Sequence, residues 1–309
     1  MEKFYYQDDE RMKRREVNLE MKVRKIRRIR TGRKGVVRMV GLLLLLAVLL
    51  AFYGFKIEPN LVTVRHYNIQ ASATGADSLR IAQISDVQIG EHYTVKNLER
   101  VVRKIQKQQP DVILFSGDLF ENYSQCGAEV EAEVTALLQR LDAPKGKYAV
   151  WGNRDYGGGA ARAYQRILKA ADFTLLRNSS VELATDAGHN ILLCGLDDSL
   201  FGKPDGSSFQ QQKGNYDYRI LALHEPDIAQ LWSHSNFQLI LAGHSHGGQV
   251  RLPFLPGMKT VLAEQYTRHF YMLNEETGLQ LYVNTGLGTS HLPIRLGVIP
   301  EIAVFTVRF

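Results

Sequence analysis

The chain of 309 residues is 45% apolar and 23% charged, a composition typical of a folded globular protein and not of a disordered one. Its formal net charge is +6, but residues 1–38 alone hold fourteen Lys and Arg against six Asp and Glu, a net of +8. Residues 39–309 therefore carry a net charge of −2, which argues against a domain that binds nucleic acid through positive charge. Two cysteines, Cys126 and Cys194, are too few for a disulfide framework or a thiolate metal site, although a single bond between them stays open.

The basic tail of residues 1–38 is followed by an uncharged apolar run, residues 39–55 (MVGLLLLLAVLLAFYGF). As a helix this run is about 26 Å long, which is enough to span a bilayer core. The basic flank is predicted to stay in the cytoplasm, so the following chain lies outside it and the protein is anchored once in the cell membrane. A cleaved signal peptide is the main alternative, but the bulky residues 52–55 do not resemble a cleavage site.

Beyond a connecting segment at 56–77, the pattern predicts one α/β domain over 78–309. Apolar runs predict strands at 79–85, 111–115 and 147–151, and helices at 95–108 and 128–141 lie between them. Thr94 is the expected N-cap of the first helix. The later chain is richer in strands, which are expected at 181–183, 190–194, 219–223, 238–242, 279–283 and 302–307.

Five of these predicted strands each run into a polar cluster. The clusters are Ser85-Asp86-Val87-Gln88, Gly117-Asp118, Gly152-Asn153-Arg154-Asp155, His224-Glu225-Pro226 and Gly243-His244-Ser245-His246. Because ligand sites of α/β sheets lie outside the carboxyl ends of the strands, we expect the five clusters to meet at one edge. They supply oxygen and nitrogen ligands without thiolate, a set suited to Mn, Fe, Zn or Mg.

In this order, the clusters resemble the motifs of the calcineurin-like metallophosphoesterases, and the resemblance covers about residues 78–309. The match is nearest to bacterial members that carry a signal or anchor, and the run from Gly286 to Gly297 is similar to their endings. The resemblance implies a two-sheet β-sandwich flanked by α-helices, and two divalent metal ions. One ion would be held by Asp86, Gln88, Asp118 and His246. The other would be held by Asp118, Asn153, His224 and His244, with Asp118 and a hydroxide as bridges.

Two positions depart from the family pattern. Gln88 stands where the first motif usually has His, and it can still coordinate a metal ion through its carbonyl oxygen. Arg154 replaces a substrate-side His; it can clamp a phosphate, but it cannot act as an acid near neutral pH. The predicted catalytic residues are Asn153, Arg154 and His244, and the predicted substrate contacts are Arg154, His92 and His291.

The function that the resemblance implies is metal-dependent hydrolysis of phosphate ester or pyrophosphate bonds, on a substrate that could be lipid-linked or part of the cell envelope. No nucleic-acid partner is expected. A catalytically weak or inactive metal-binding scaffold on the same fold is the alternative, because of the substitutions at Gln88 and Arg154. A protein Ser/Thr phosphatase fits less well, since the domain is expected outside the cytoplasm.

Overall fold

The computed structural model describes residues 2–72, 75–157, 159–212, 214–254 and 256–309, without the side chains of 2–10, 29–34, 210 and 211. The chain divides into two compact units, Met1–Tyr53 and Gly54–Phe309. The first unit is the helix α1 (Glu2–Phe52). Among the described residues one helical segment, Gly35–Asn60, is long and apolar enough to cross a membrane, with a mean hydropathy of 2.6. It includes the run predicted to be an anchor.

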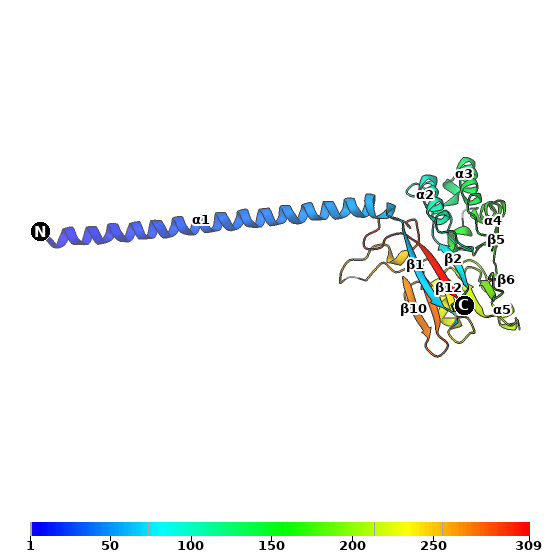
Figure 1. Ribbon diagram of the computed structural model, residues 1–309. Helices are drawn as coiled ribbons and strands as arrows, with labels where there is room; N and C mark the ends of the chain where they lie inside the picture. Colours follow the sequence, from blue (N-terminus) through cyan, green and yellow to red (C-terminus); the bar gives the residue numbers. More distant parts are fainter. Residues whose placement is uncertain (1, 73–74, 158, 213, 255) are drawn as a thin grey trace. The chain divides into compact units, whose positions relative to one another are not determined.

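A π-helical turn (Tyr53–Ile57) begins at the last residue of the first unit and is followed by a 3-10 turn (Glu58–Asn60). The described part of the second unit contains two six-stranded sheets (Figure 1). The first sheet has the order β1-β12-β2-β3-β4-β5. Its strands are β1 (Thr63–Gln70), β2 (Ser78–Ile84), β3 (Val112–Phe115), β4 (Lys147–Ala149), β5 (Phe173–Leu175) and β12 (Glu301–Arg308). The segment 56–77, expected only to connect, thus contributes β1. The late strand β12 lies between β1, its parallel partner, and β2, its antiparallel partner.

The second sheet has the order β10-β11-β9-β8-β7-β6. Its strands are β6 (Ser179–Ala184), β7 (Asn190–Gly195), β8 (Tyr218–Ala222), β9 (Leu239–Ala242), β10 (His269–Asn274) and β11 (Leu279–Val283). Within it β7, β8, β9 and β11 run parallel, as β2, β3, β4 and β5 do in the first sheet. Both sheets therefore present the carboxyl ends of several parallel strands along one edge, where ligand sites form.

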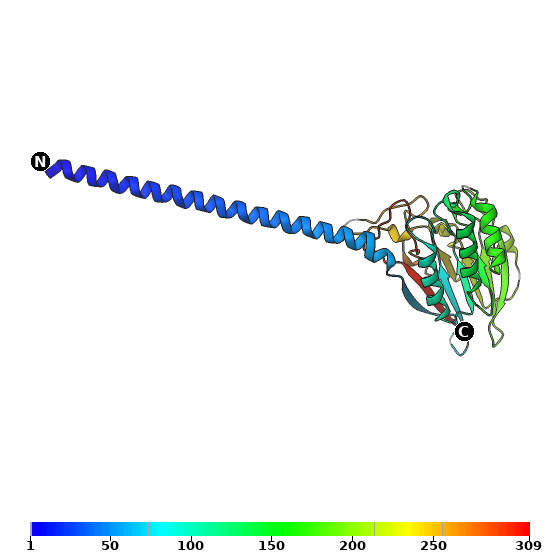
Figure 2. The same ribbon diagram turned by 90° about the horizontal axis from the view of Figure 1, so that it is seen from above.

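Side chains alternate between the two faces of each strand and so build layers. In β3, Val112 and Leu114 pack between the sheets, whereas Ile113 and Phe115 pack under the helices. Those helices are α2 (Val95–Gln106), α3 (Ala128–Gln139) and α4 (Ala160–Ala170), which lie side by side across the first sheet (Figure 2). The outer face of the second sheet is covered by loops, the short helix α5 (Ser207–Gln211) and the 3-10 turn Pro226–Trp232.

The predicted architecture of two sheets flanked by helices is confirmed. Thr94 is the N-cap of α2, and its backbone N–H donates to the Asn97 side chain at 3.2 Å. Cys126 and Cys194 are both free, so the disulfide left open by the sequence is not formed. Three further 3-10 turns, Tyr123–Gln125, Asn153–Asp155 and His246–Gly248, lie in loops, and the last two belong to the predicted metal clusters.

Candidate metal centre

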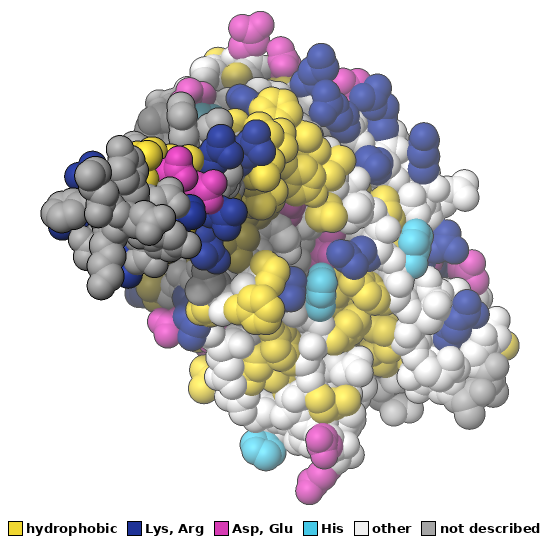
Figure 3. Space-filling view, turned by 90° about the vertical axis from the view of Figure 1, so that its left-hand side faces the viewer, with side chains coloured by type: hydrophobic (Ala, Val, Ile, Leu, Met, Phe, Trp, Pro, Cys, Tyr) yellow, Lys and Arg dark blue, Asp and Glu magenta, His cyan; other side chains and the backbone are white. Residues whose placement is uncertain are grey.

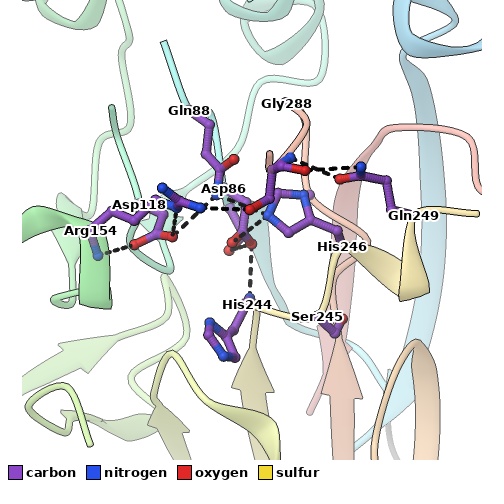
Figure 4. A network of polar contacts seen from close by, with 12 residues as sticks. Asp86, Gln88, Asp118, Arg154, His244, Ser245, His246, Gln249 and Gly288 are labelled. Atoms are coloured by element: carbon purple, nitrogen blue, oxygen red, sulfur yellow. Dashed lines mark hydrogen bonds and ion pairs between the residues drawn. The ribbon is translucent and has the colours of Figure 1, made fainter. Parts of the chain in front are cut away.

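The five polar clusters follow five strand ends, and residues from four of them meet in Figure 4. His224, from the remaining cluster, lies within 4.0 Å of both Asp86 and Asp118. The clusters after β2, β3 and β4 come from the first sheet, and those after β8 and β9 come from the second. The backbone turns sharply at these ends, because five predicted ligands have φ between +48° and +66°, a region that non-glycine residues seldom adopt. These residues are Asp86, Gln88, Asp118, His244 and His246. Strain of this kind persists where the surrounding structure imposes it, and it is frequent at functional sites.

The side chains converge on two buried carboxylates, Asp86 and Asp118. His224 Nε2 lies 3.5 Å from Asp118 Oδ1 and 4.0 Å from Asp86 Oδ1. His246 Nε2 lies 3.5 Å from Asp86 Oδ1. Asp86, Asp118 and His224 form one buried group able to hold a metal ion, and His224 forms a second group with Glu225 and His244.

Backbone carbonyls orient two of the histidine rings. His224 Nδ1 lies 2.6 Å from Ser116 O, and His244 Nε2 lies 2.8 Å from Val261 O. A carbonyl can only accept, so each of these nitrogens carries the proton of its ring. The remaining nitrogens, His224 Nε2 and His244 Nδ1, face each other at 3.2 Å. Two facing lone pairs repel, so neutral rings in this arrangement require a positive charge between or beside them.

Burial and the charges inside the cluster shift the pKa values of its carboxylates and histidines. Burial acts to raise the pKa of Asp118, but the charge and hydrogen bond of His224 outweigh it and lower the pKa. Burial acts to lower the pKa of His224, yet Asp118 and Asp86 raise it well above the usual value. Burial, together with the charge of His224, lowers the pKa of His244 to about 4. Burial and the nearby charge of Asp118 raise the pKa of Asp86 to about 6.

Unpaired acceptor atoms test whether the cluster fits a cation. Asp86 Oδ1, Gln88 Oε1 and Asn153 Oδ1 are buried atoms without a hydrogen-bond partner. Buried polar atoms in native proteins are nearly always paired, and oxygen atoms from carboxylates and amides are good ligands for divalent metals. The residues present therefore fit divalent metal ions.

Gln88 directs its amide group to the same cluster. Its Nε2 lies 2.9 Å from His246 Nε2 and 3.3 Å from Asp118 Oδ2, while its Oε1 is turned away (Figure 4). Rotation about the last side-chain bond exchanges the two amide atoms, so the oxygen can reach the position from which a ligand would coordinate. The substitution of Gln for the family's His thus keeps a potential ligand in place.

Arg154 lies at the rim of the cluster and joins three segments. Its backbone N–H donates to Asp118 Oδ1 at 2.9 Å, and its Nε lies 3.8 Å from Asp118 Oδ2. The guanidinium also donates to Glu121 O at 2.9 Å and to Ser290 Oγ at 2.7 Å. The nitrogen that donates to Ser290 also lies 3.4 Å from His291 Nε2, so that the Arg154 and His291 side chains adjoin. The guanidinium lines the cleft, where its charge can attract an anion.

Two positioning residues were not predicted from the sequence. The buried Asp155 carboxylate accepts from the backbone N–H groups of Asp118, Leu119 and Gly152 at 2.8–3.0 Å, which ties the second and third clusters together. Fully buried Arg295 donates to Gly288 O and Thr285 O and lies 3.4 Å from His246 Nδ1. Asp155 stands in the third polar cluster and Arg295 in the run from Gly286 to Gly297, but the sequence does not show which backbone atoms each of them binds.

A cleft of about 520 Å³ opens over the cluster. Its polar wall includes Arg154 and His291, whereas His92 lines an adjoining smaller cavity. Four large apolar side chains also line the cleft, and the most exposed of them is Phe201, at 67%. The cleft's apolar lining is Leu200, Phe201, Met258 and Val261. In Figure 3, apolar side chains gather around a hollow that also shows histidine and basic side chains.

Comparison with known proteins gives one family. Residues 79–248 match the sequence pattern of the calcineurin-like phosphoesterases. The metallophosphoesterase YkuE of Bacillus subtilis is 34% identical over 262 residues, which cover 83% of this chain and 90% of that protein. The UDP-2,3-diacylglucosamine pyrophosphatase LpxG of Chlamydia trachomatis is 28% identical, and the match covers 78% of this chain and 88% of LpxG. A transmembrane protein with a metallophosphoesterase domain from Bos taurus is 27% identical, and the match covers 79% of this chain and 56% of that protein.

Replacement of Asp118 should cost more bound metal than replacement of Gln88, because Asp118 approaches residues of both predicted ligand sets. We expect Asp118→Asn to lose most bound Mn²⁺ or Zn²⁺, and Gln88→Ala to lose less. Elemental analysis of the purified, dialysed variants measures both. Asp205→Asn, at an exposed carboxylate, is the matched control. Equal metal contents for Asp118→Asn and wild type would contradict the shared role of Asp118.

Proposed function

Because the chain belongs to the calcineurin-like phosphoesterase family and is a metallophosphoesterase, we propose that it hydrolyses phosphate ester or pyrophosphate bonds with two divalent metal ions. The ions would be Mn, Fe, Zn or Mg. Asp86, Gln88, Asp118 and His246 would hold one, and Asp118, Asn153, His224 and His244 would hold the other. The observation that carries this proposal is the buried cluster of acceptors with unpaired oxygens and facing imidazole nitrogens.

When bound, two such ions lower the pKa of water and neutralise the charge of a phosphoryl group. The chain supplies the fixed geometry. Ser116 O and Val261 O hold the rings of His224 and His244, so these two side chains need not reorient during turnover. Asn153 lines the cleft and has an unpaired amide oxygen, so it would serve as a ligand and as a neutral neighbour of the phosphate. Asn153, Arg154 and His244 are the proposed catalytic residues.

Arg154 would bind the phosphoryl oxygens. Glu121 O and Ser290 Oγ hold its guanidinium at the cleft, where it supplies a fixed positive charge. It can stabilise negative charge on a departing oxygen, but it has no proton to give. This supports a preference for leaving groups that are already weak bases, such as phosphate, nucleotide or aryl oxide. His291, 3.4 Å from the guanidinium, and His92 are the further proposed substrate contacts.

An amphiphilic substrate fits the apolar part of the cleft. Leu200, Phe201, Met258 and Val261 line the cleft over the cluster. Phe254, beyond the cleft's apolar lining, is fully exposed and has a φ of +72°, an unfavourable conformation for a bulky residue. The relative LpxG is a pyrophosphatase named after its substrate UDP-2,3-diacylglucosamine, and that substrate carries two acyl groups. We therefore propose a lipid-linked phosphate as the substrate.

The membrane assignment follows from the helical segment Gly35–Asn60 and the basic residues before it. The segment would cross the cell membrane once, with the N-terminal tail in the cytoplasm and the catalytic body outside it. A lipid-linked or cell-envelope substrate would be available on that side. The basic tail would meet anionic lipid headgroups.

Hydrolysis itself is tested with bis-p-nitrophenyl phosphate and the Mn²⁺-loaded protein. We expect turnover that chelation with EDTA abolishes and that Asp118→Asn lowers by about 10²-fold or more, because the carboxylate serves both ions. Release of p-nitrophenol measures it, with Asp205→Asn as the control. Metal-loaded wild type without activity on diesters, monoesters and pyrophosphates would instead indicate a metal-binding scaffold.

The leaving-group preference is tested by Arg154→His, which restores the usual family residue. We expect wild type to favour aryl esters and pyrophosphates over alkyl diesters, and the variant to raise the alkyl-to-aryl ratio of kcat/KM about tenfold, since a general acid contributes at least that much. Arg166→His, at an exposed arginine paired with Glu131, is the control. If wild type hydrolyses alkyl and aryl esters equally well, a group other than Arg154 acts as the acid. Loss of alkyl-ester turnover in His291→Ala or His92→Ala would then identify that group.

Phe254→Ser tests the contribution of the exposed ring to lipid recognition. We expect kcat/KM for a diacylated phosphate ester in detergent micelles to fall about tenfold, because burial of a Phe side chain is worth roughly 1.5–3 kcal/mol. Activity on a water-soluble ester should be unchanged. Leu231→Ser removes another highly exposed apolar side chain, 79% exposed, outside the cleft lining and serves as the control. Equal losses for both substrates would count against a lipid contact.

The orientation in the membrane is tested by protease treatment of intact cells or spheroplasts that carry the full chain. We expect protease to digest the body after residue 60 without lysis, because the basic flank holds the tail in the cytoplasm. An antibody against the body follows the digestion, and a cytoplasmic protein controls for leakage. A body that is degraded only after lysis would overturn the proposed orientation.

A further inference from the structure

Exposed apolar side chains gather on one loop beside the cleft. Leu252, Phe254, Met258 and Val261 follow the fifth polar cluster, and each of them exposes at least 40% of its surface. We call these four residues the apolar loop. Single exposed apolar residues are ordinary on protein surfaces, but a local group of large ones marks a surface that meets another molecule or a membrane.

Backbone hydrogen bonds connect the apolar loop to the end of the candidate membrane segment. Arg251, directly before the loop, donates its N–H to Leu296 O at 2.7 Å. The preceding residue of that second loop, Arg295, donates its N–H to Gly54 O at 3.0 Å. Gly54 belongs to the helical segment Gly35–Asn60. The backbone at 295–296 therefore lies between the end of the membrane segment and the start of the apolar loop.

A buried carboxylate fixes the same connection. Glu58 accepts from the backbone N–H groups of Gly297 at 3.0 Å and Val298 at 2.5 Å. Backbone segments joined by hydrogen bonds lie about 5 Å apart, so two such steps place Arg251 within about 10 Å of Gly54. Where the segment leaves a bilayer, the apolar loop is thus held beside the same bilayer surface.

Basic side chains accompany the apolar ones. Arg251 directly precedes the apolar loop, Lys259 lies within it, and Lys56 lies in the end of the membrane segment. Residues 247–263 contain neither Asp nor Glu. Apolar residues flanked by basic ones are typical of segments that enter the interfacial region of a bilayer with anionic headgroups. A second copy of this chain, docked through the same loop, would instead bring like charges together.

We propose that the apolar loop inserts into the surface of the membrane that the segment Gly35–Asn60 crosses. Phe254, which is fully exposed, would lie deepest, and Arg251 and Lys259 would meet the lipid phosphates. Part of the apolar loop also lines the cleft, so the cleft over the metal centre would open at the level of the headgroups. This inference rests on the membrane assignment made above, and it does not depend on which bond the site hydrolyses.

Quenching by brominated lipid tests the insertion. The full chain with Phe254→Trp is reconstituted into vesicles of phosphatidylcholine and phosphatidylglycerol, with or without bromine on the phosphatidylcholine acyl chains. The native Trp151 and Trp232 are buried, and the unsubstituted chain gives their background. We expect most of the emission added by Phe254→Trp to be lost in the brominated vesicles, because an interfacial segment reaches about 5–10 Å into the boundary of headgroups and acyl chains.

Two further variants place the effect on the surface. Leu231→Trp is the matched control, because Leu231 is also highly exposed and lies in the 3-10 turn Pro226–Trp232, outside the apolar loop. Its added emission should be equal in the two kinds of vesicle. Leu252→Trp gives a second position in the apolar loop and should be quenched as Phe254→Trp is. Substitutions at exposed positions change stability little, and thermal unfolding of each variant checks that it folds.

Equal emission from Phe254→Trp and Leu252→Trp in brominated and plain vesicles would overturn the insertion. A blue-shifted but unquenched emission would do the same, since the apolar loop would then pack on protein, either on its own chain or on a second copy. Equal quenching of Leu231→Trp would also overturn it, because no face of the body would be preferred.

Flotation of the vesicles on a density gradient tests the membrane assignment separately. The full chain should float with the vesicles, and a chain that stays behind would remove the anchor and the insertion together. Neither measurement involves hydrolysis. A chain that is quenched as expected but hydrolyses no ester would therefore lose the proposed activity and keep the membrane contact.

Discussion

Positive charge at the meeting point of the two sheets is the requirement on which the site depends. Asp86 and Asp118 are fully buried, two imidazole nitrogens face each other at 3.2 Å, and further oxygens nearby are unpaired. Buried negative charge without compensation is very costly, so this edge cannot be stable as a bare set of acceptors. A proton on His224 offsets part of the charge, and divalent ions would offset more of it. The binding of metal would therefore stabilise the folded body as well as equip it for chemistry.

The framework around this charge is made largely from backbone groups. Asp155 accepts from three amides, Ser116 and Val261 lend their carbonyls to histidines, and Gly117 has a φ of +92°. A side chain at Gly117 would come within 2.5 Å of Gly152 N and 2.9 Å of His224 Nδ1. Close approach of backbone segments at this point thus holds the clusters in register, and the side chains that face the metal centre are left free to bind it.

Much of this arrangement could be predicted from the sequence because it follows strand periodicity. Apolar runs identified the strands, and the polar residues directly after them identified Asp86, Asp118, Asn153 and the histidines. Asp155 follows β4 in the same cluster as Asn153, but its bonds to the backbone of the second cluster could not be predicted, because only folding brings those loops together. The same holds for Arg295, which binds loop carbonyls. The strand β1 was missed because its exposed edge alternates weakly between apolar and polar residues.

The place of β12 has a consequence for how the body forms. This strand, residues 301–308, is inserted between β1 and β2, and Thr63 pairs with Glu301 across 238 positions of sequence. Closure of so long a loop is slow, and until it happens β1 has no partner and β2 lacks one neighbour. The first sheet therefore stays incomplete, with one edge of β2 open, until residues 301–308 have been made. An open edge of this kind exposes unpaired backbone groups, so the body is most prone to aggregate during that interval.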